Sequence, residues 1–369
     1  MSLSTTEYNA ESQESQASTL LDFPADDAQP QTENIASVLA SVPSVPHPIT
    51  PLQHSYTYHS PTPTAPGPYI LGVDEAGRGP VLGPMVYGVA YCPVAWEEEL
   101  EALGFADSKT LNHGARTGLL DVLSGRPDQL GWSVRVLAYV PSPPCPSLKP
   151  NSAQSESESD GYSPQDISAN MLRRPPQNLN EQSREATTLL INALLSRGLK
   201  ISAIYVDALG PSVPYQAYLS SLYPTMDITV TPKADSKYKI VGAASIAAKV
   251  TRDAWIEGWV FEEEYLDGDL EGGRGGKKGW TENLGSGYPS DPKTQAWLRD
   301  SVEPTFGYPS LARFSWGTVR VALDKAAHKV EWIDDGEKTL VNAFQTATGH
   351  DKGRRAVARD LAIHSVDSL

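Results

Sequence analysis

Apolar residues occur in short runs that predict strands alternating with helices. Runs with the length and the β-branched or aromatic content of strands lie at 69–74, 84–92, 132–140, 201–207 and 227–232. Helical spacing is found at 115–123, 183–197, 215–221 and 235–261, and further helices are expected at 297–300, 315–329 and 337–346. Ser183 is the expected N-cap of the second helix. This alternation predicts an α/β fold.

Composition divides the chain into a folded part and several polar segments. Residues 1–66 are rich in Ser, Thr, Gln and Pro and poor in large aliphatics, which predicts a disordered extension. The folded part is expected at 67–325, with insertions at about 143–165 and 267–284. Residues 326–369 are predicted to form a helical extension and a tail.

Length and composition place the chain among ordinary globular proteins. It has 369 residues, of which 40% are hydrophobic and 20% are charged. No apolar run approaches the roughly 18–20 residues of a membrane helix, and the N-terminus lacks the pattern of a secretory signal. Only two cysteines occur, Cys92 and Cys145, which favours a reducing compartment over a disulfide framework.

The net charge of −15 is unevenly distributed and does not exclude a polyanionic partner. Residues 1–66 carry seven acids and no Lys or Arg, which leaves −8 for all other residues. Between 227 and 252 the balance is reversed, because only Asp227 and Asp235 oppose five cations, which are Lys233, Lys237, Lys239, Lys249 and Arg252. This segment could bind a polyanion or form an ordinary solvated helix face, and the sequence leaves both interpretations open.

The strongest chemical signal follows the first predicted strand. Asp74 and Glu75 end an apolar run, and the turn Gly77-Arg78-Gly79 comes two residues later. Acidic residues are rarely placed at the end of a buried strand without a cation, and divalent metals prefer oxygen ligands. The glycines leave their backbone amides uncovered, and the Arg78 guanidinium supplies several donors, which together are suited to bind phosphate. The segment indicates metal-assisted phosphodiester chemistry, with a plain polar turn as the alternative.

Two further acids occupy equivalent places. Asp207 ends an apolar strand, and Asp235 follows the next strand and opens a predicted helix. In open α/β sheets ligands bind beyond the carboxyl ends of strands, so these acids are expected to approach Asp74. Asp207 could instead be a turn acceptor, and Asp235 an N-cap. Clustered carboxylates repel one another, and two divalent ions would neutralise them.

An ordered series of motifs is similar to the catalytic subunits of eukaryotic type 2 ribonucleases H. The resemblance covers roughly 69–262 and 285–325. The segments that carry it are Gly72–Pro80, Asp107–Leu111, Val206-Asp207, Lys233–Tyr238, Ala243–Asp253 and Gly285–Pro292. The resemblance implies a ribonuclease H-like mixed β-sheet flanked by helices. It also implies hydrolysis of RNA in RNA–DNA hybrids and incision 5′ of single ribonucleotides in duplex DNA.

The resemblance also implies roles for individual residues. Asp74, Glu75, Asp207 and Asp235 would be the catalytic set, holding two Mg²⁺ or Mn²⁺ ions. The substrate contacts would be Gly77, Arg78 and Gly79 at the ribose 2′-hydroxyl, Tyr288 at the adjacent sugar, and Lys109 and Lys249 at phosphates. Two accessory subunits would dock on the helical part from about residue 315, in a nuclear heterotrimer.

Two other classes stay open at this point. One is a hybrid-binding scaffold that has lost catalysis, against which the presence of all four acids argues. The other is a metal-dependent nuclease of the transposase or resolvase type on the same fold. The Gly-Arg-Gly turn and Tyr288 favour ribonucleotide recognition over that second class.

Overall fold

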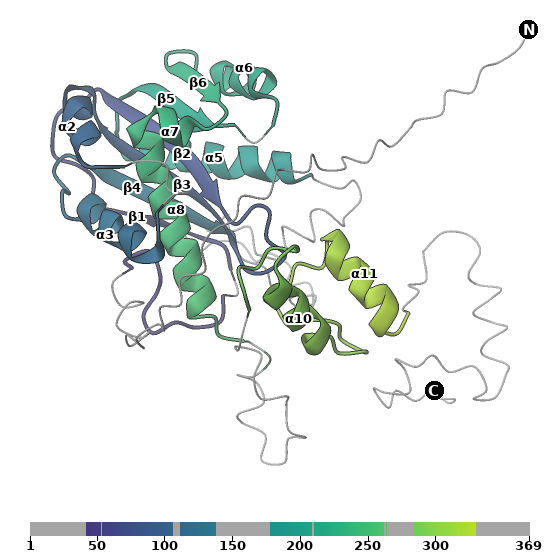
Figure 1. The fold of residues 1–369 in the computed structure, drawn as a ribbon. Coiled ribbons are helices and arrows are strands. Elements are labelled where there is room, and N and C mark those ends of the chain that lie inside the picture. Colours follow the sequence, from purple (N-terminus) through teal and green to yellow (C-terminus); the bar gives the residue numbers. More distant parts are fainter. Residues whose placement is uncertain are drawn as a thin grey trace, which may run out of the picture.

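The computed structural model describes residues 42–52, 54–105, 111–137, 178–208, 210–261, 263 and 284–329. The insertion expected at 143–165, the expected helix at 337–346, nearly all of the insertion at 267–284, and Lys109 lie outside these residues. Within the described part, the chain forms a mixed six-stranded sheet with helices on both faces (Figure 1).

The sheet has the strand order β1-β4-β3-β2-β5-β6. The strands are β1 (Tyr56–His59), β2 (Tyr69–Ala76), β3 (Met85–Pro93), β4 (Gly131–Leu137), β5 (Ile201–Asp207) and β6 (Asp227–Thr231). β2, β3, β4 and β1 pair antiparallel, whereas β5 runs parallel to β2 and β6 runs parallel to β5. The mixed sheet expected from the sequence is therefore present.

The helices cover the sheet and extend beyond one end of it. They are α2 (Glu97–Ala102), α3 (His113–Ser124), α5 (Leu179–Ser196), α6 (Ser212–Leu222), α7 (Ala234–Lys237), α8 (Lys239–Glu257), α10 (Pro292–Ser301) and α11 (Gly317–Ala326), with a 3-10 turn η1 (Val94–Trp96). α10 and α11 lie beside each other, away from the other helices (Figure 1). In the part that is described, none of these helices is long and apolar enough to cross a membrane.

Alternating side chains of the strands feed two separate cores. Ile70 of β2 packs toward α8 and α3, and its neighbour Leu71 packs toward α5 and α6. α8 lies almost directly on the backbone of β2. A Cβ atom at Gly72 would stand 2.4 Å from the carbonyl carbon of Ile240, so only glycine permits this approach. The close packing fixes the position of α8 over the end of β2.

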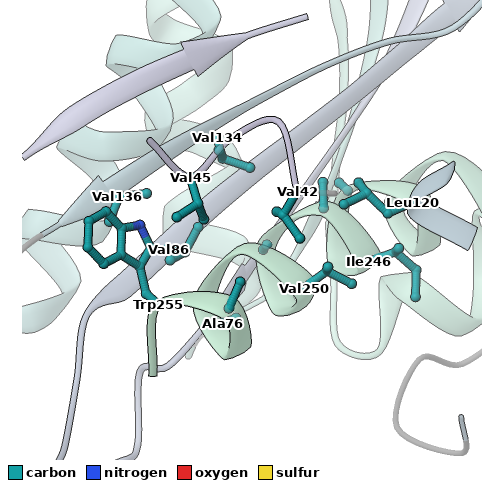
Figure 2. Packing of buried hydrophobic residues seen from close by; sticks show 14 of the residues in the cluster. Val42, Val45, Ala76, Val86, Leu120, Val134, Val136, Ile246, Val250 and Trp255 are labelled. Carbon is teal, nitrogen blue, oxygen red and sulfur yellow. The ribbon is translucent and has the colours of Figure 1, made fainter. Parts of the chain in front are cut away.

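The N-terminal segment corrects the expectation that all of residues 1–66 are disordered. Val42 and Val45 are buried beside α8 (Figure 2), and Leu52 is buried in the same core. Residues 56–59 form the edge strand β1. Ser44 is hydrogen-bonded through its hydroxyl to that of Thr251 at 2.6 Å. These apolar residues follow neither helical nor strand spacing, so the pattern gave no signal of burial.

Two helices begin or break differently from the prediction. α5 begins at Leu179, because Asn178 and Glu181 form a capping box, and Ser183 lies within the helix. The single helix expected at 235–261 is interrupted at Tyr238, which has an extended backbone. The ring of Tyr238 stacks on Tyr205 of β5 with centroids 4.2 Å apart, which compensates for the break.

Candidate active site

Strand register brings the first two predicted acids together. β2 and β5 are parallel, and their last pair is Val73 with Val206, so Asp74 and Asp207 follow on adjacent strands. Neighbouring strands lie about 4.8 Å apart. Both acids line one cavity of about 340 Å³ at this end of the sheet. The expectation that Asp74 and Asp207 converge is therefore met.

Helix α8 supports Asp74 from one face of the sheet. The Asp74 carboxylate accepts a hydrogen bond from Ser245 and another from the backbone N–H of Glu75 at 2.8 Å. Burial raises the pKa of Asp74 to about 6; the nearby Asp207 charge adds to this shift, whereas the Ser245 bond and the Lys249 charge oppose it. The folded state therefore holds this carboxylate in an environment that disfavours its charge.

Glu75 belongs to the same electrostatic cluster. Burial raises its pKa well above the ordinary value, and the charges of Asp74 and Asp207 raise it further, while Arg78 lowers it. Asp74, Glu75 and Asp207 line one cavity, and carboxylate oxygens are the ligands that hard divalent cations prefer, so the chemistry of these donors suits such a cation. A bound cation would counter the repulsion between the carboxylates.

Asp235 is not among the residues that line this cavity, and its role as a fourth ligand stays a prediction. Its buried carboxylate accepts a hydrogen bond from the backbone N–H of Ser236 at 3.0 Å. Asp235 directly follows Ala234, whose backbone N–H donates to Asp207 Oδ1 at 2.9 Å, so Asp235 lies beside the site. Among the described residues, no three acidic, histidine or cysteine side chains stand close enough to hold an ion in this arrangement.

A left-handed residue creates that placement. Lys233 has φ 55°, a conformation that side chains other than glycine rarely adopt, at the turn from β6 into α7. The turn directs the backbone of Ala234 to Asp207 and leaves Asp235 one residue inside the helix. This backbone geometry sets where the Asp235 carboxyl lies relative to Asp207.

The Gly-Arg-Gly turn forms the next wall of the cavity. Gly77 has φ +78°, and a Cβ atom there would stand 2.5 Å from the carbonyl oxygen of Pro84, so both conformation and space require glycine. Arg78 donates hydrogen bonds to Ser183 Oγ at 2.6 Å and to Asn180 Oδ1 at 2.5 Å, both in α5. Gly77, Arg78 and Gly79 all line the cavity, as predicted.

A buried arginine holds this turn from far along the chain. The Arg313 side chain has no exposed surface, and it donates to the carbonyl oxygens of Gly77 at 2.6 Å, Gly83 at 2.8 Å and Arg78 at 3.3 Å. Its guanidinium lies 4.8 Å from the ring centroid of Trp316, whose Nε1–H donates to the carbonyl oxygen of Gly79 at 3.3 Å. Neither Arg313 nor Trp316 was predicted from the sequence.

Tyr288 faces the turn from the loop that precedes α10. The backbone N–H of Val81 donates to the carbonyl oxygen of Gly287 at 2.7 Å, which fixes this loop beside the turn. A Cβ atom at Gly79 would stand 3.2 Å from the Tyr288 ring, so the ring lies against the glycine backbone. Tyr288 is 47% exposed and lines the cavity, as expected for a residue that contacts a ligand.

Three charged residues of the cavity were not predicted as site residues. Arg116, Arg252 and Asp253 line it, and Asp253 pairs with Arg116 at 3.1 Å and with Arg252 at 3.3 Å. Arg252 follows Lys249 by three residues and therefore shares its face of α8. This three-residue spacing is visible in the sequence of the basic segment. It distinguishes Lys249 and Arg252 from the other lysines of the segment, which do not line the cavity.

Comparisons with known proteins identify the family of the chain. The family model for Ribonuclease HII matches residues 71–319. The chain belongs to the ribonuclease HII family. It is accordingly an enzyme, a ribonuclease H. The match begins in β2 and ends in α11, so it contains Asp74, Asp207, Tyr288 and Arg313, whereas the buried N-terminal segment lies before it.

Individual members of this group show how far the similarity extends. The chain is 41% identical to the A subunit of ribonuclease H2 of Homo sapiens over 271 residues, which is 73% of this chain and 78% of the relative. It is 39% identical to the corresponding protein of Arabidopsis thaliana over 273 residues, or 74% and 79% of the two chains. A further match is the crystal structure of ribonuclease H2 from Pyrococcus horikoshii OT3, whose sequence is 32% identical. The match covers 70% of this chain and 98% of that one, with a TM-score of 0.49. Family membership rests on the sequence matches.

Proposed function

We propose that this chain is a catalytic subunit that hydrolyses the RNA strand of RNA–DNA hybrids. We further propose that it incises duplex DNA on the 5′ side of single embedded ribonucleotides and leaves 3′-hydroxyl and 5′-phosphate ends. One observation carries the proposal: Asp74, Glu75 and Asp207 share a cavity with the Gly-Arg-Gly turn and Tyr288. Carboxylates for hydrolysis and groups for sugar recognition thus face the same space.

The turn supplies recognition of the ribonucleotide. The 2′-hydroxyl is the group that distinguishes RNA from DNA at a given position. Glycine backbone can approach it closely, because Gly77 and Gly79 place no side chain between the backbone and the cavity. The Tyr288 ring opposite Gly79 would contact the neighbouring sugar, where a hydrogen at the 2′ position leaves more room than a hydroxyl.

The acids supply the cation site. Asp74, Glu75 and Asp207 would hold two divalent ions, Mg²⁺ or Mn²⁺, with Asp235 as the proposed fourth ligand. Such ions supply an activated water and stabilise the leaving oxygen in an in-line displacement at phosphorus. Ser245 orients Asp74 through its hydrogen bond, and the Ala234 N–H orients Asp207. Lys249 and Arg252 add positive charge on the same wall for substrate phosphates.

We also propose that the chain acts with partner proteins and in the nucleus. Its mammalian relatives carry the name of the A subunit of ribonuclease H2, which supports an assembly of several subunits. Two accessory subunits are the proposal for this chain, docked on the helical part from about residue 315. The proposed substrate, duplex DNA with embedded ribonucleotides, supports the nuclear location.

A cleavage assay on one defined duplex tests the proposed activity. Purified chain, alone and with candidate partner subunits, is incubated with a duplex that contains one ribonucleotide, with Mg²⁺ or with EDTA. We expect a single incision 5′ of the ribonucleotide with Mg²⁺ only, and no incision by the Asp74→Asn variant. An all-DNA duplex is the matched control. Equal cutting by Asp74→Asn, or cutting of the all-DNA control, would refute the assignment.

A further inference from the structure

A second cavity borders the Gly-Arg-Gly turn. It has a volume of about 450 Å³ and is lined by Arg78, Gly79, Leu179, Ser315, Trp316 and Gly317. Arg78 and Gly79 also line the catalytic cavity, so the turn borders both spaces. A strand bound at the turn therefore has both cavities within reach.

The chemistry of the second cavity differs from that of the first. Four acids line the catalytic cavity, whereas the residues that line the second cavity within the described part include one cation, Arg78, and no carboxylate. The remaining lining combines an indole ring, an aliphatic side chain and a hydroxyl, from Trp316, Leu179 and Ser315. A cation beside apolar and aromatic surface suits a sugar–phosphate unit rather than a metal ion.

The walls of this cavity are fixed before any ligand binds. Arg78 is held against α5 by Ser183 and Asn180, which use two of the five N–H donors of a guanidinium. Trp316 is held by its hydrogen bond to the Gly79 carbonyl oxygen and by Arg313 on its ring. A site whose groups are already in place loses little conformational entropy on binding.

We propose that this second cavity binds the sugar–phosphate backbone of the substrate strand next to the nucleotide held in the catalytic cavity. Arg78 contacts the phosphate between the two units, and Trp316 contacts the sugar of the outer unit. The inference rests on the proposed function, because the same strand must occupy both cavities. Its consequence is that affinity depends on the length of the strand beyond the turn and on the charge of the second cavity.

Gly317 offers a direct test of that charge dependence. A Cβ atom at Gly317 meets no heavy atom within 4 Å, and aspartate is favourable in the first turn of a helix, so Gly317→Asp is expected to fold. Gly317→Asn has the same shape without the charge. Gly118→Asp in α3 adds the same charge at an exposed position that also has no neighbour within 4 Å and lines neither cavity.

The measurement is the fluorescence anisotropy of a labelled RNA–DNA hybrid of about 20 base pairs, titrated with full-length chain in EDTA. We expect Gly317→Asp to raise the Kd about fivefold or more relative to Gly317→Asn, since a like charge now faces phosphate. Gly118→Asp is expected to stay within about twofold of wild type. Trimming the hybrid from one end should remove the difference between Gly317→Asp and Gly317→Asn.

The results separate this inference from the proposed function. Equal Kd values for Gly317→Asp and Gly317→Asn would overturn the second cavity as a strand site. An equal loss in Gly118→Asp would also overturn it, because the effect would then come from net charge. If wild type still cleaves the hybrid with Mg²⁺ in either case, the proposed nuclease function stands and only this inference fails.

Discussion

Asp74 illustrates how a single residue couples stability to chemistry. Its pKa is raised to about 6 from 3.8, first by burial and then by Asp207, so the ionised form is unfavourable in the folded protein. A protein that keeps such a carboxylate ionised for a cation gives up stability in the absence of that cation.

This pKa shift predicts a pH dependence of stability without metal. Between about pH 4 and pH 6 the folded protein binds more protons than the unfolded chain, so the free energy of unfolding falls as the pH rises through that window. In EDTA, the melting temperature should therefore fall between about pH 4 and pH 6, and the fall should be smaller in Asp74→Asn. Scanning calorimetry measures this. An identical fall in both proteins would show that Asp74 does not titrate in this range.

Tyr288 is the residue whose role depends on the type of substrate. Its ring lies against Gly79 and is 47% exposed, so its removal should leave the fold intact. We expect Tyr288→Ala to slow incision at a single ribonucleotide about tenfold, the scale of a lost ring contact, and cleavage of a long hybrid about twofold. Tyr288→Phe retains the ring and should resemble wild type. Equal losses on both substrates would remove its proposed role at the junction.

At the scale of elements, the recognition turn depends on a residue that is remote in sequence. Arg313 binds three carbonyl oxygens, which belong to Gly77, Arg78 and Gly83. A single arginine between Ala312 and Phe314 gives no sequence signal of this, because charged residues are expected at the surface. The tertiary contact, rather than any local pattern, determines the conformation of the turn.

Replacement of Arg313 should therefore damage both the fold and substrate recognition. We expect Arg313→Met to lower the free energy of unfolding by about 2–4 kcal/mol, because one buried and two partly buried carbonyl oxygens lose their donor. Arg313→Lys keeps the charge with fewer donors and should be intermediate. Urea titration measures the stability. Arg320→Met, at an exposed position of α11, is the control, and an equal effect of both changes would contradict the proposed contact.

The elements themselves were largely predictable, and the exceptions have physical causes. β5 was predicted as Ile201–Asp207 and has those bounds, because a continuous apolar run with clear ends specifies it. The break at Tyr238 was not predictable, because it is stabilised by stacking on Tyr205, a contact between residues that are distant in sequence. The capping box at Asn178 was a visible pattern that was overlooked.

At the scale of the whole molecule, the N-terminal segment is part of the domain. Val42 and Val45 are buried beside α8 (Figure 2), and Leu52 is buried in the same core. The Ser44 hydroxyl is hydrogen-bonded to that of Thr251, which directly precedes Arg252 of the catalytic cavity. The segment precedes the part of the chain that the family model matches. Its contacts therefore connect a segment outside the family core to the wall of the active site.

Deletion of this segment should destabilise the enzyme. A chain that lacks residues 1–52 loses three buried apolar side chains and the buried Ser44, and we expect its melting temperature to fall by about 6 °C or more. A chain that lacks residues 1–41 keeps the buried segment and should melt within about 2 °C of the full chain. Differential scanning fluorimetry compares them. Equal melting temperatures for the two deletions would show that residues 42–52 do not stabilise the domain.

The site as a whole was predictable where strand ends determine it. Asp74 and Asp207 could be placed together because parallel strands align their carboxyl ends at one edge. The position of the Asp235 carboxyl could not be predicted from the sequence, because the left-handed Lys233 sets the direction in which α7 begins. Arg116 lines the cavity from α3, and no local pattern indicated that this helix packs against α8.

The central claim is that Asp74, Glu75 and Asp207 together bind divalent cations. Isothermal titration calorimetry with Mn²⁺ tests it directly on wild type, Asp74→Asn and Asp207→Asn, with Asp121→Asn on α3 as a control outside the cavity. We expect wild type and Asp121→Asn to bind Mn²⁺. In Asp74→Asn and Asp207→Asn the affinity for Mn²⁺ should fall by about 100-fold or more, because removing a ligand lowers metal affinity more than removing a residue that only supports a ligand. Unchanged Mn²⁺ binding in Asp74→Asn and Asp207→Asn would contradict the account.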